Sequence, residues 1–419
     1  MKLFDIVVIG AGAAGLLAAG RAAALGARVL LLERNEKPGR KLLITGKGRC
    51  NITNVSQKSE FTKKVFPNPR FLNHAFAIFF SDDIIKLLNE QGLETVVERG
   101  ERVFPASQKS SDVVDTLVRW VKKNGAEIRL GQRVEHLILD GGMVTGVRLR
   151  QNERVIDVPC GKVIVATGGK SYPATGSTGD GYRLAEEAGH SIVPMQQSLV
   201  PIETVGHIAQ KMQGLSLKNV KASVWVDGKK STDEFGEMLF THFGLSGPII
   251  LTLSRSIVSA LKQGRKVEVS VDLKPALDEG KLDKRLLRDL NEQGRKKMSN
   301  LIRLWLPSAM VPVFLELTGI DPETEAHQLP ATLRHKAMLL LKDFRFKVSG
   351  CRSFKEAIIT AGGVNTSEVE PKTMQSKLVK NLYFAGEVLD LDADTGGYNL
   401  QIAWSTGWLA GQEAAKTTS

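Results

Sequence analysis

Cysteine is scarce in this chain, with only Cys50, Cys160 and Cys351 among 419 residues. The three are widely spaced, odd in number and form no CxxC pair. This pattern argues against a disulfide framework, a zinc site and dithiol exchange beside a redox cofactor. We therefore expect no bound metal and a reducing, cytoplasmic environment.

Long apolar segments are also missing. A long uncharged run, Met238 to Ser254, is interrupted by histidine, glycine and proline and is too short to span a bilayer. The apolar start of the chain contains Asp5 and leads directly into a glycine-rich motif, so we interpret it as a first strand and not as a secretory signal. We expect no membrane association.

The composition is that of a globular protein, with 42% apolar and 24% charged residues. Its 40 glycines cluster in short motifs without a period, which excludes a repeat architecture. A chain of 419 residues is too long for one compact core, so two or three domains are expected.

The formal charge of +12 is distributed unevenly. Between Lys37 and Ser81 the only acid is Glu60, so nine bases minus one acid leave +8 in about a tenth of the chain. Such a concentration is typical of sites for polyanions or anionic small molecules. The nine bases are Lys37, Arg40, Lys41, Lys47, Arg49, Lys58, Lys63, Lys64 and Arg70.

The N-terminal part has the pattern of an α/β domain. An apolar strand from Leu3 to Ile9 meets a glycine-rich turn, an Ala/Leu-rich helix ends near Gly26, and a second strand, Arg28 to Leu32, follows. Helical and extended patterns then alternate, which predicts a doubly wound sheet. These later segments are helices at Asp82 to Gln91 and Asp112 to Lys123 and strands at Glu127 to Leu130 and Val134 to Leu139.

The middle of the chain has a different pattern. Residues 220–226 and 267–273 alternate with a period of two, and Asp227-Gly228 between them is a strong hairpin signal. Leucines at helical spacing follow between Leu282 and Leu317, with Arg295-Lys296-Lys297 on the surface. A strand at 380–384 and a helix from Gly397 restore the α/β pattern. We predict a Rossmann-type domain, residues 1–194 and 351–419, interrupted by a β-rich, barrel-like and helical domain, residues 195–350.

The first glycine motif, Gly10-x-Gly12-x-x-Gly15, carries the first chemical signal because it joins a strand to a helix. Its glycines suit a tight turn, close approach to a diphosphate and packing of the helix on the sheet. The diphosphate would meet the free N–H groups at the helix N-terminus. Glu33, eighteen residues past Gly15, is placed to accept hydrogen bonds from a ribose. A dinucleotide site is predicted.

The C-terminal region favours FAD over NAD. A strand ends at Gly386-Glu387, and Thr395 to Leu400, with Gly397 at its centre, begins a helix rich in small residues. The N-terminus of such a helix can face the pyrimidine edge of a flavin, where negative charge gathers on reduction. A domain that binds only a nicotinamide dinucleotide does not need a C-terminal strand and helix that come back to the cofactor.

Several longer motifs resemble the BaiN/RdsA-type family of bacterial FAD-dependent oxidoreductases. These are Pro38 to Asn51, Ala166 to Gly169, Thr241 to Pro248 and Gly396 to Gly407, and the resemblance covers essentially the whole chain. Members include ribosomal-RNA dihydrouridine synthase, aminoacetone oxidase and a flavoprotein of bile-acid dehydroxylation. The resemblance implies FAD, a three-part architecture and a reductase or oxidase activity, while the substrate does not transfer with the fold.

Matched to that family, a set of positions would lie along the FAD. No second GxGxxG follows a second βαβ unit, so NAD(P)H, if it is the electron donor, would bind transiently without its own Rossmann domain. The sequence does not exclude a different electron donor. Together with the glycines of the motifs above, the expected cofactor contacts are Gly10, Gly12, Ala14, Gly15, Glu33, Arg34, Lys41, Thr45, Gly46, Asn51, Val134, Thr167, Gly168, Gly386, Glu387, Gly397, Asn399 and Leu400.

Three residues are candidates for catalysis. Cys50, beside Arg49, could donate a proton, although a packed small residue is the alternative. His242 lies in a glycine-rich segment that could face the flavin, as an acid, as an anion anchor or as an ordinary loop histidine. Tyr172 is the third candidate. The sequence does not choose among them.

Three functions remain for the chain. The first is an NAD(P)H-linked reductase that passes hydride from flavin N5 to an activated double bond, here uridine in 23S ribosomal RNA, and the basic residues favour it. The second is a small-molecule flavin oxidoreductase or amine oxidase. The third is a non-catalytic flavin-dependent binding protein.

Overall fold

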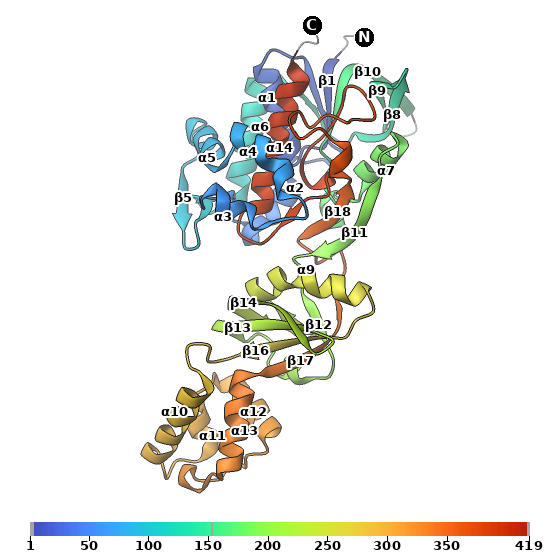
Figure 1. Ribbon diagram of the computed structural model, residues 1–419. Helices are drawn as coiled ribbons and strands as arrows, with labels where there is room; N and C mark the ends of the chain where they lie inside the picture. Colours follow the sequence, from blue (N-terminus) through green and yellow to red (C-terminus); the bar gives the residue numbers. More distant parts are fainter. Residues whose placement is uncertain (1–3, 152–153, 417–419) are drawn as a thin grey trace. The chain divides into compact units, whose positions relative to one another are not determined.

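The computed structural model describes residues 4–151 and 154–416 (Figure 1). Leu3, the first residue of the predicted N-terminal strand, lies outside these ranges. The contacts between residues divide the chain into two compact units. One unit runs up to Gln197 and resumes at Ala357, and the other is Ser198–Glu356.

A seven-stranded sheet forms the centre of the first unit. Five of its strands are parallel: β1 (Phe4–Ile9), β2 (Val29–Leu32), β7 (Glu127–Arg129), β10 (Arg154–Val165) and β19 (Leu382–Phe384). Their order is β7-β2-β1-β10, and β19 pairs with β10. The strand 163–165 at the end of β10 therefore lies between the N-terminal strand and a strand from the last forty residues.

The other two strands depart from the predicted doubly wound pattern. β8 (Arg133–Asp140) and β9 (Met143–Gln151) form an antiparallel ribbon with the first half of β10. Gly141 and Gly142, with φ of 54° and 77°, connect β8 to β9. Two successive residues with positive φ match the right-handed twist of a tight hairpin, so the chain reverses directly and no crossover helix forms.

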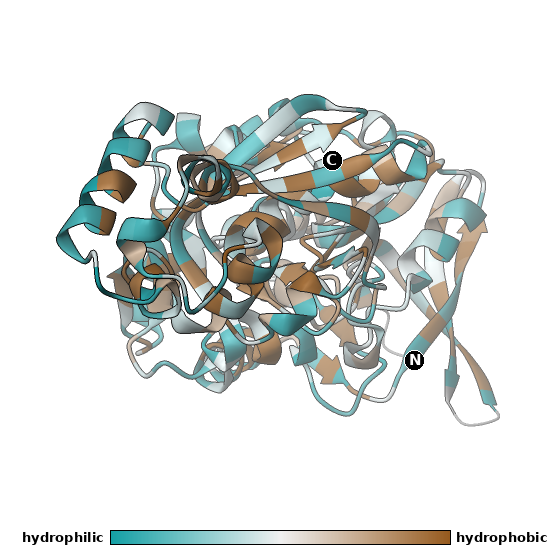
Figure 2. Cartoon of the chain, turned by 90° about the horizontal axis from the view of Figure 1, so that it is seen from below, coloured by the Kyte–Doolittle hydropathy of each residue, from teal (hydrophilic) through white to brown (hydrophobic). Residues whose placement is uncertain are grey.

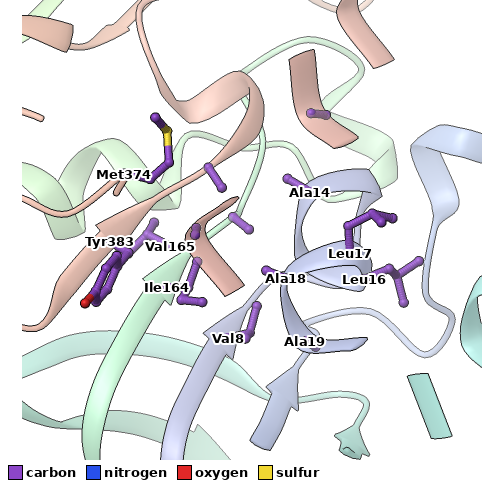
Figure 3. Close-up of a cluster of buried hydrophobic side chains, with 14 of the residues drawn as sticks. Val8, Ala14, Leu16, Leu17, Ala18, Ala19, Ile164, Val165, Met374 and Tyr383 are labelled. Carbon is purple, nitrogen blue, oxygen red and sulfur yellow. The ribbon is translucent and has the colours of Figure 1, made fainter. Parts of the chain in front are cut away.

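Three helices pack together in the first unit: α1 (Ala13–Ala24), α6 (Ser110–Lys123) and α14 (Tyr398–Ala415). The buried core beside α1 includes Leu16, Val8 and Ile164 (Figure 3). A Cβ added to Gly407 or Gly411 of α14 would lie 2.3 Å from a backbone oxygen of α1. Glycine is therefore required where the C-terminal helix meets the first one.

Shorter elements complete this unit. The helices are α2 (Arg40–Ile44), α3 (Lys58–Thr62), α4 (Asn73–Ile78), α5 (Ser81–Glu90), α7 (Asp180–Glu187) and the 3-10 turns η1 (Thr45–Gly48), η2 (Pro69–Leu72), η3 (Pro173–Thr175), η7 (Thr366–Glu368) and η8 (Gly386–Val388). The strands are β3 (Thr53–Asn54), β4 (Val65–Phe66), β5 (Thr95–Glu98), β6 (Arg102–Pro105), β11 (Ile192–Ser198), β18 (Ile359–Val364) and β20 (Asp392–Ala393).

The second unit contains a closed barrel in the order β12-β15-β14-β13-β16-β17. Asp227 and Gly228 both have positive φ, at 50° and 76°, and connect β13 to β14 as the sequence predicts. Inward-facing residues such as Val224, Val269 and Phe346 are buried. The strands are β12 (Ile202–Thr204), β13 (Ser216–Val226), β14 (Lys229–Phe240), β15 (Gly244–Ser246), β16 (Val267–Asp272) and β17 (Phe344–Cys351), with α8 (Ile208–Lys211) and α9 (Pro248–Lys262).

Helices between β16 and β17 form the rest of the second unit. They are α10 (Glu279–Glu292), α11 (Met298–Leu301), η4 (Ile302–Leu304), η5 (Ser308–Met310), α12 (Val311–Thr318), η6 (Ala326–Gln328) and α13 (Ala331–Lys342). Most helices carry both apolar and polar residues (Figure 2). Within the described ranges, no helix is both long and apolar enough to cross a bilayer. The predicted fold class, a Rossmann-type sheet with an inserted barrel and helices, is confirmed.

Candidate cofactor site

The predicted cofactor residues follow the ends of neighbouring parallel strands. Gly10 follows β1, Glu33 follows β2, Thr167 comes two residues after β10, and Gly386 comes two residues after β19. Because the carboxyl ends of parallel strands meet at one edge of a sheet, these positions gather there although they are up to 376 residues apart.

The three glycines of the first motif differ in what surrounds them. Gly10 has φ of +100°, and an added Cβ would lie 2.6 Å from the carbonyl oxygen of Ala166. A Cβ on Gly15 would lie 1.8 Å from the oxygen of Gly10. At Gly12, the N-cap of α1, a Cβ would meet nothing within 4 Å. Gly10 and Gly15 are thus required by the protein's own packing, whereas Gly12 borders open space at the helix N-terminus.

Glu33 supports the turn that follows β1. Its Oε2 accepts the backbone N–H of Ala11 at 2.8 Å, and its Oε1 accepts the backbone N–H and side-chain amide of Asn35 at 2.9 and 2.7 Å. Glu33 as a whole residue is 7% exposed. Two carboxylate oxygens offer about four lone pairs, so one acceptor position remains for a ribose hydroxyl. The ribose contact stays a prediction.

Arg34 follows Glu33 after β2, and Val134 is the second residue of β8. The guanidinium of Arg34 donates to Thr178 at 2.5 Å and pairs with Asp180 at 3.0 Å, so it holds the first turn of α7. Val134 is buried in β8 at 3% exposure. Both residues therefore have structural contacts, and their contacts with FAD stay predictions.

Lys41 and Glu387 form an ion pair, with Lys41 Nζ 2.6 Å from Glu387 Oε2. The other oxygen of Glu387 accepts the backbone N–H of Thr360 on β18 at 2.9 Å. Thr360 Oγ1 in turn accepts the N–H groups of Lys170 and Ser171 at 2.8 and 3.0 Å. Thr360 was missed by sequence reasoning, although paired glycines at 362–363, like those at 168–169, could have drawn attention to it.

The loop after α2 is held by its own backbone. Thr45 Oγ1 donates to the carbonyl of Leu42 at 2.7 Å, and the Cys50 N–H donates to the Thr45 carbonyl at 3.0 Å. Gly46 and Cys50 have φ of 57° and 59°, which turns the chain sharply. Cys50 is fully buried, and burial raises the pKa of its thiol to about 12. This environment favours the packed-residue role over that of a proton donor.

Two buried side-chain oxygens test whether the site fits a dinucleotide. Asn51 Oδ1 and Thr167 Oγ1 are inaccessible to water and have no hydrogen-bond partner within the described part of the chain. Buried polar groups are nearly always paired, so these two oxygens are suited to a bound polar molecule. Gly168, with φ of +75°, follows directly. The residues present fit the FAD that the family match implies.

The start of α14 is shaped by backbone contacts. Gly386 and Gly397 have φ of +78° and +99°, and a Cβ on Gly397 would lie 2.5 Å from the carbonyl of Thr53. The Asn399 amide accepts from the Ala393 N–H at 2.8 Å and donates to the Ala393 carbonyl at 2.7 Å. Leu400 is half-buried. Ala14 packs against Gly386, since a Cβ there would meet Ala14 Cβ at 2.8 Å.

The catalytic candidates are not brought into one cluster by the described contacts. Cys50 and Tyr172 belong to the first unit, and Tyr172 has φ of 51° just before η3. His242 belongs to the second unit, between β14 and β15, with its ring edge against Phe243. Within the ranges described, no group of three His, Cys, Asp or Glu side chains could hold a metal ion.

Known proteins resemble this chain along its full length. The family model described as the HI0933-like protein Rossmann domain matches residues 4–413. A ribosomal RNA dihydrouridine synthase of Escherichia coli is 34% identical over 420 residues, which is 100% of both chains. A 3-dehydro-bile acid delta(4,6)-reductase of Clostridium scindens is 32% identical over 413 residues, covering 98% of this chain and 99% of the reductase.

A solved structure shares the fold. The 3-ketosteroid delta1-dehydrogenase from Sterolibacterium denitrificans aligns with a TM-score of 0.52 at 14% identity, covering 99% of this chain and 100% of the dehydrogenase. At that identity the likeness concerns the fold alone.

Proposed function

The chain belongs to the HI0933-like family and is an FAD-dependent oxidoreductase, and from this premise we propose that it reduces uridine in 23S ribosomal RNA to dihydrouridine. The observation that carries the proposal is the end-to-end match to a ribosomal RNA dihydrouridine synthase. The net charge of +12 supports it, since phosphate contacts supply most non-specific affinity for nucleic acid.

The FAD would be held at the carboxyl edge of the parallel strands. Its diphosphate would lie over Gly12 at the N-terminus of α1, where an anion meets backbone N–H groups. Asn51 Oδ1 would accept a hydrogen bond from a donor group of the FAD, and the Thr167 hydroxyl would donate or accept one. Beside the FAD, the ion pair of Lys41 and Glu387 would hold α2 and the loop after it against β18.

The proposed reaction adds a hydride and a proton across one carbon–carbon double bond of the uracil ring. Bound FAD supplies the hydride chemistry, and we propose NAD(P)H, which loses one hydride, as the electron donor. The proton comes from a side chain of this protein or from water.

A second candidate function is the reduction of a small molecule that carries a conjugated double bond. The match to the bile-acid reductase, at 32% identity and nearly full length, supports it. Both candidates require hydride addition to an activated double bond, so they differ in how the substrate is recognised and not in the chemistry. An amine oxidase would instead release peroxide in air.

An experiment in cells distinguishes the two candidate functions. We expect one uridine of 23S ribosomal RNA to be reduced in the parent strain and unreduced when the gene is deleted. The wild-type gene should restore it, and a Gly12→Leu variant should not, because the longer side chain fills the open space at the end of α1. An unchanged dihydrouridine content after deletion would move the small-molecule function to first place.

A further inference from the structure

Helix α10 presents two opposite faces. Leu282, Leu286 and Leu290 are 1%, 1% and 4% exposed and pack inward. The exposed residues between and after them are mainly basic and lie on successive turns. They are Lys281, Lys284, Arg285 and Arg288 on the helix and Arg295, Lys296 and Lys297 in the turn that follows.

The acids of this segment do not cancel that charge. Residues 281–303 contain eight bases and three acids, a net charge of +5. Asp289 is 9% exposed, accepts the indole N–H of Trp305 at 3.0 Å, and lies 3.6 Å from Arg285 and 3.8 Å from Arg288. Asp283 pairs at 3.0 Å with Arg334, a base from α13. Glu292 is therefore the one exposed acid of the three that faces solvent among the bases.

Three of the bases have no carboxylate within ion-pair distance among the residues that the structure describes. They are Lys284, Arg295 and Lys296, all of them exposed. The other four bases are paired, Lys281 with Asp278, Arg285 and Arg288 with Asp289, and Lys297 with Glu323. Charge that no acid compensates is available to an external polyanion.

We propose that this basic ridge, the exposed side of α10 with residues 295–297, docks the ribosomal RNA by its phosphates. The inference rests on the proposed function. The part of the ridge on the helix, from Lys281 to Asn291, extends about 15 Å at 1.5 Å per residue, enough for several consecutive phosphates. The ridge contributes affinity and orientation, and sequence is read elsewhere.

The test compares two variants of the full-length FAD-loaded protein. One variant carries Lys284→Glu, Arg295→Glu and Lys296→Glu, which break no ion pair. The matched control carries Lys122→Glu, Lys355→Glu and Lys372→Glu, exposed positions with the same change in net charge. Binding to protein-free 23S ribosomal RNA from the deletion strain is measured across a salt titration, together with the flavin spectrum and the rate of dihydrouridine formation.

We expect the ridge variant to bind at least about tenfold more weakly and to lose about 0.7 to 0.9 of the salt slope for each contact removed. Its KM for RNA should rise while kcat and the flavin spectrum stay unchanged. The control should match the parent. If RNA binding weakens equally in both variants, or does not weaken in the ridge variant, the proposal that the ridge docks the RNA is overturned. A parent protein that neither binds nor reduces the RNA overturns the proposed function as well.

Discussion

The ammonium of Lys41 lies 2.6 Å from the carboxylate of Glu387, although 346 residues separate them in the sequence. The pair joins α2 to the turn after β19, and Glu387 continues the connection to Thr360 on β18. Segments from the two ends of the chain are thus fixed to each other beside the proposed FAD.

Replacing Lys41 with methionine should weaken both the fold and the cofactor site. The side chains of Lys41 and Glu387 are 21% and 16% exposed, so the change leaves a largely buried carboxylate unpaired. We expect a loss of about 2 kcal/mol in unfolding free energy. FAD should also dissociate faster in a gel-filtration assay. Lys122→Met, at an exposed position of α6, is the control, and equal behaviour of the two variants would contradict this role.

Two neighbouring glycines should respond differently to alanine. A Cβ at Gly12 meets nothing within 4 Å, so Gly12→Ala should leave the stability of the FAD-free protein within about 0.5 kcal/mol while weakening FAD binding. Gly15→Ala places a Cβ 1.8 Å from the Gly10 oxygen and should cost about 3 kcal/mol with or without FAD. Urea unfolding and FAD titration measure both. Undiminished FAD affinity in Gly12→Ala would place the diphosphate elsewhere.

The buried imidazole of His190 should make the first unit sensitive to acid. Its Nδ1 lies 3.1 Å from Glu368 and its Nε2 2.7 Å from Ser376. Burial lowers the pKa of His190 below its ordinary value of 6.5, against the opposing pull of Glu368. Below pH 6.5 the unfolded chain therefore binds a proton at His190 more readily than the folded chain does. The free energy of unfolding should decrease as the pH falls below 6.5.

Urea unfolding at about pH 7.5 and about pH 5.5 measures this loss, which for one proton is at most about 1.4 kcal/mol per pH unit. His190→Gln should reduce the difference between the two pH values. His242→Gln, at an exposed position, should leave it unchanged. A difference that persists in His190→Gln would assign the acid sensitivity to other groups.

The cysteines should be poor nucleophiles in the native protein. Burial raises the thiol pKa of Cys50 and of Cys160 to about 12, and it also raises that of half-buried Cys351. Iodoacetamide near neutral pH should label Cys351 slowly and the other two only after unfolding. Cys50→Ala should retain turnover. Rapid native labelling of Cys50 would restore it as a catalytic candidate.

Much of the fold was readable from the sequence because its signals are local. The glycine motif, the two hairpin residues at 227–228 and the helix from Gly397 each follow from short-range backbone requirements. The strand predicted at Val134 to Leu139 was wrongly placed in a doubly wound pattern, since alternation alone does not tell a hairpin from a crossover. Long-range polar contacts such as Thr360 with Lys170 leave no periodic signal.

Catalysis was the least readable part. Cys50 and Tyr172 were singled out by residue type, and side-chain chemistry depends on burial and partners that only the folded chain supplies. Family resemblance supplied the positions of Asn51 and Thr167, whose side-chain oxygens are buried without a partner among the described residues, and their contacts with FAD stay predictions.

The central claim is that this FAD-dependent oxidoreductase reduces uridine in ribosomal RNA. The most direct test uses purified, FAD-loaded protein without oxygen, reduced with NADH or NADPH and then mixed with 23S ribosomal RNA from the deletion strain. The account predicts that visible flavin absorbance returns on mixing and that one dihydrouridine forms for each flavin reoxidised, as counted by mass spectrometry. Flavin that stays reduced with this RNA, yet is reoxidised by a small conjugated ketone, would contradict the account.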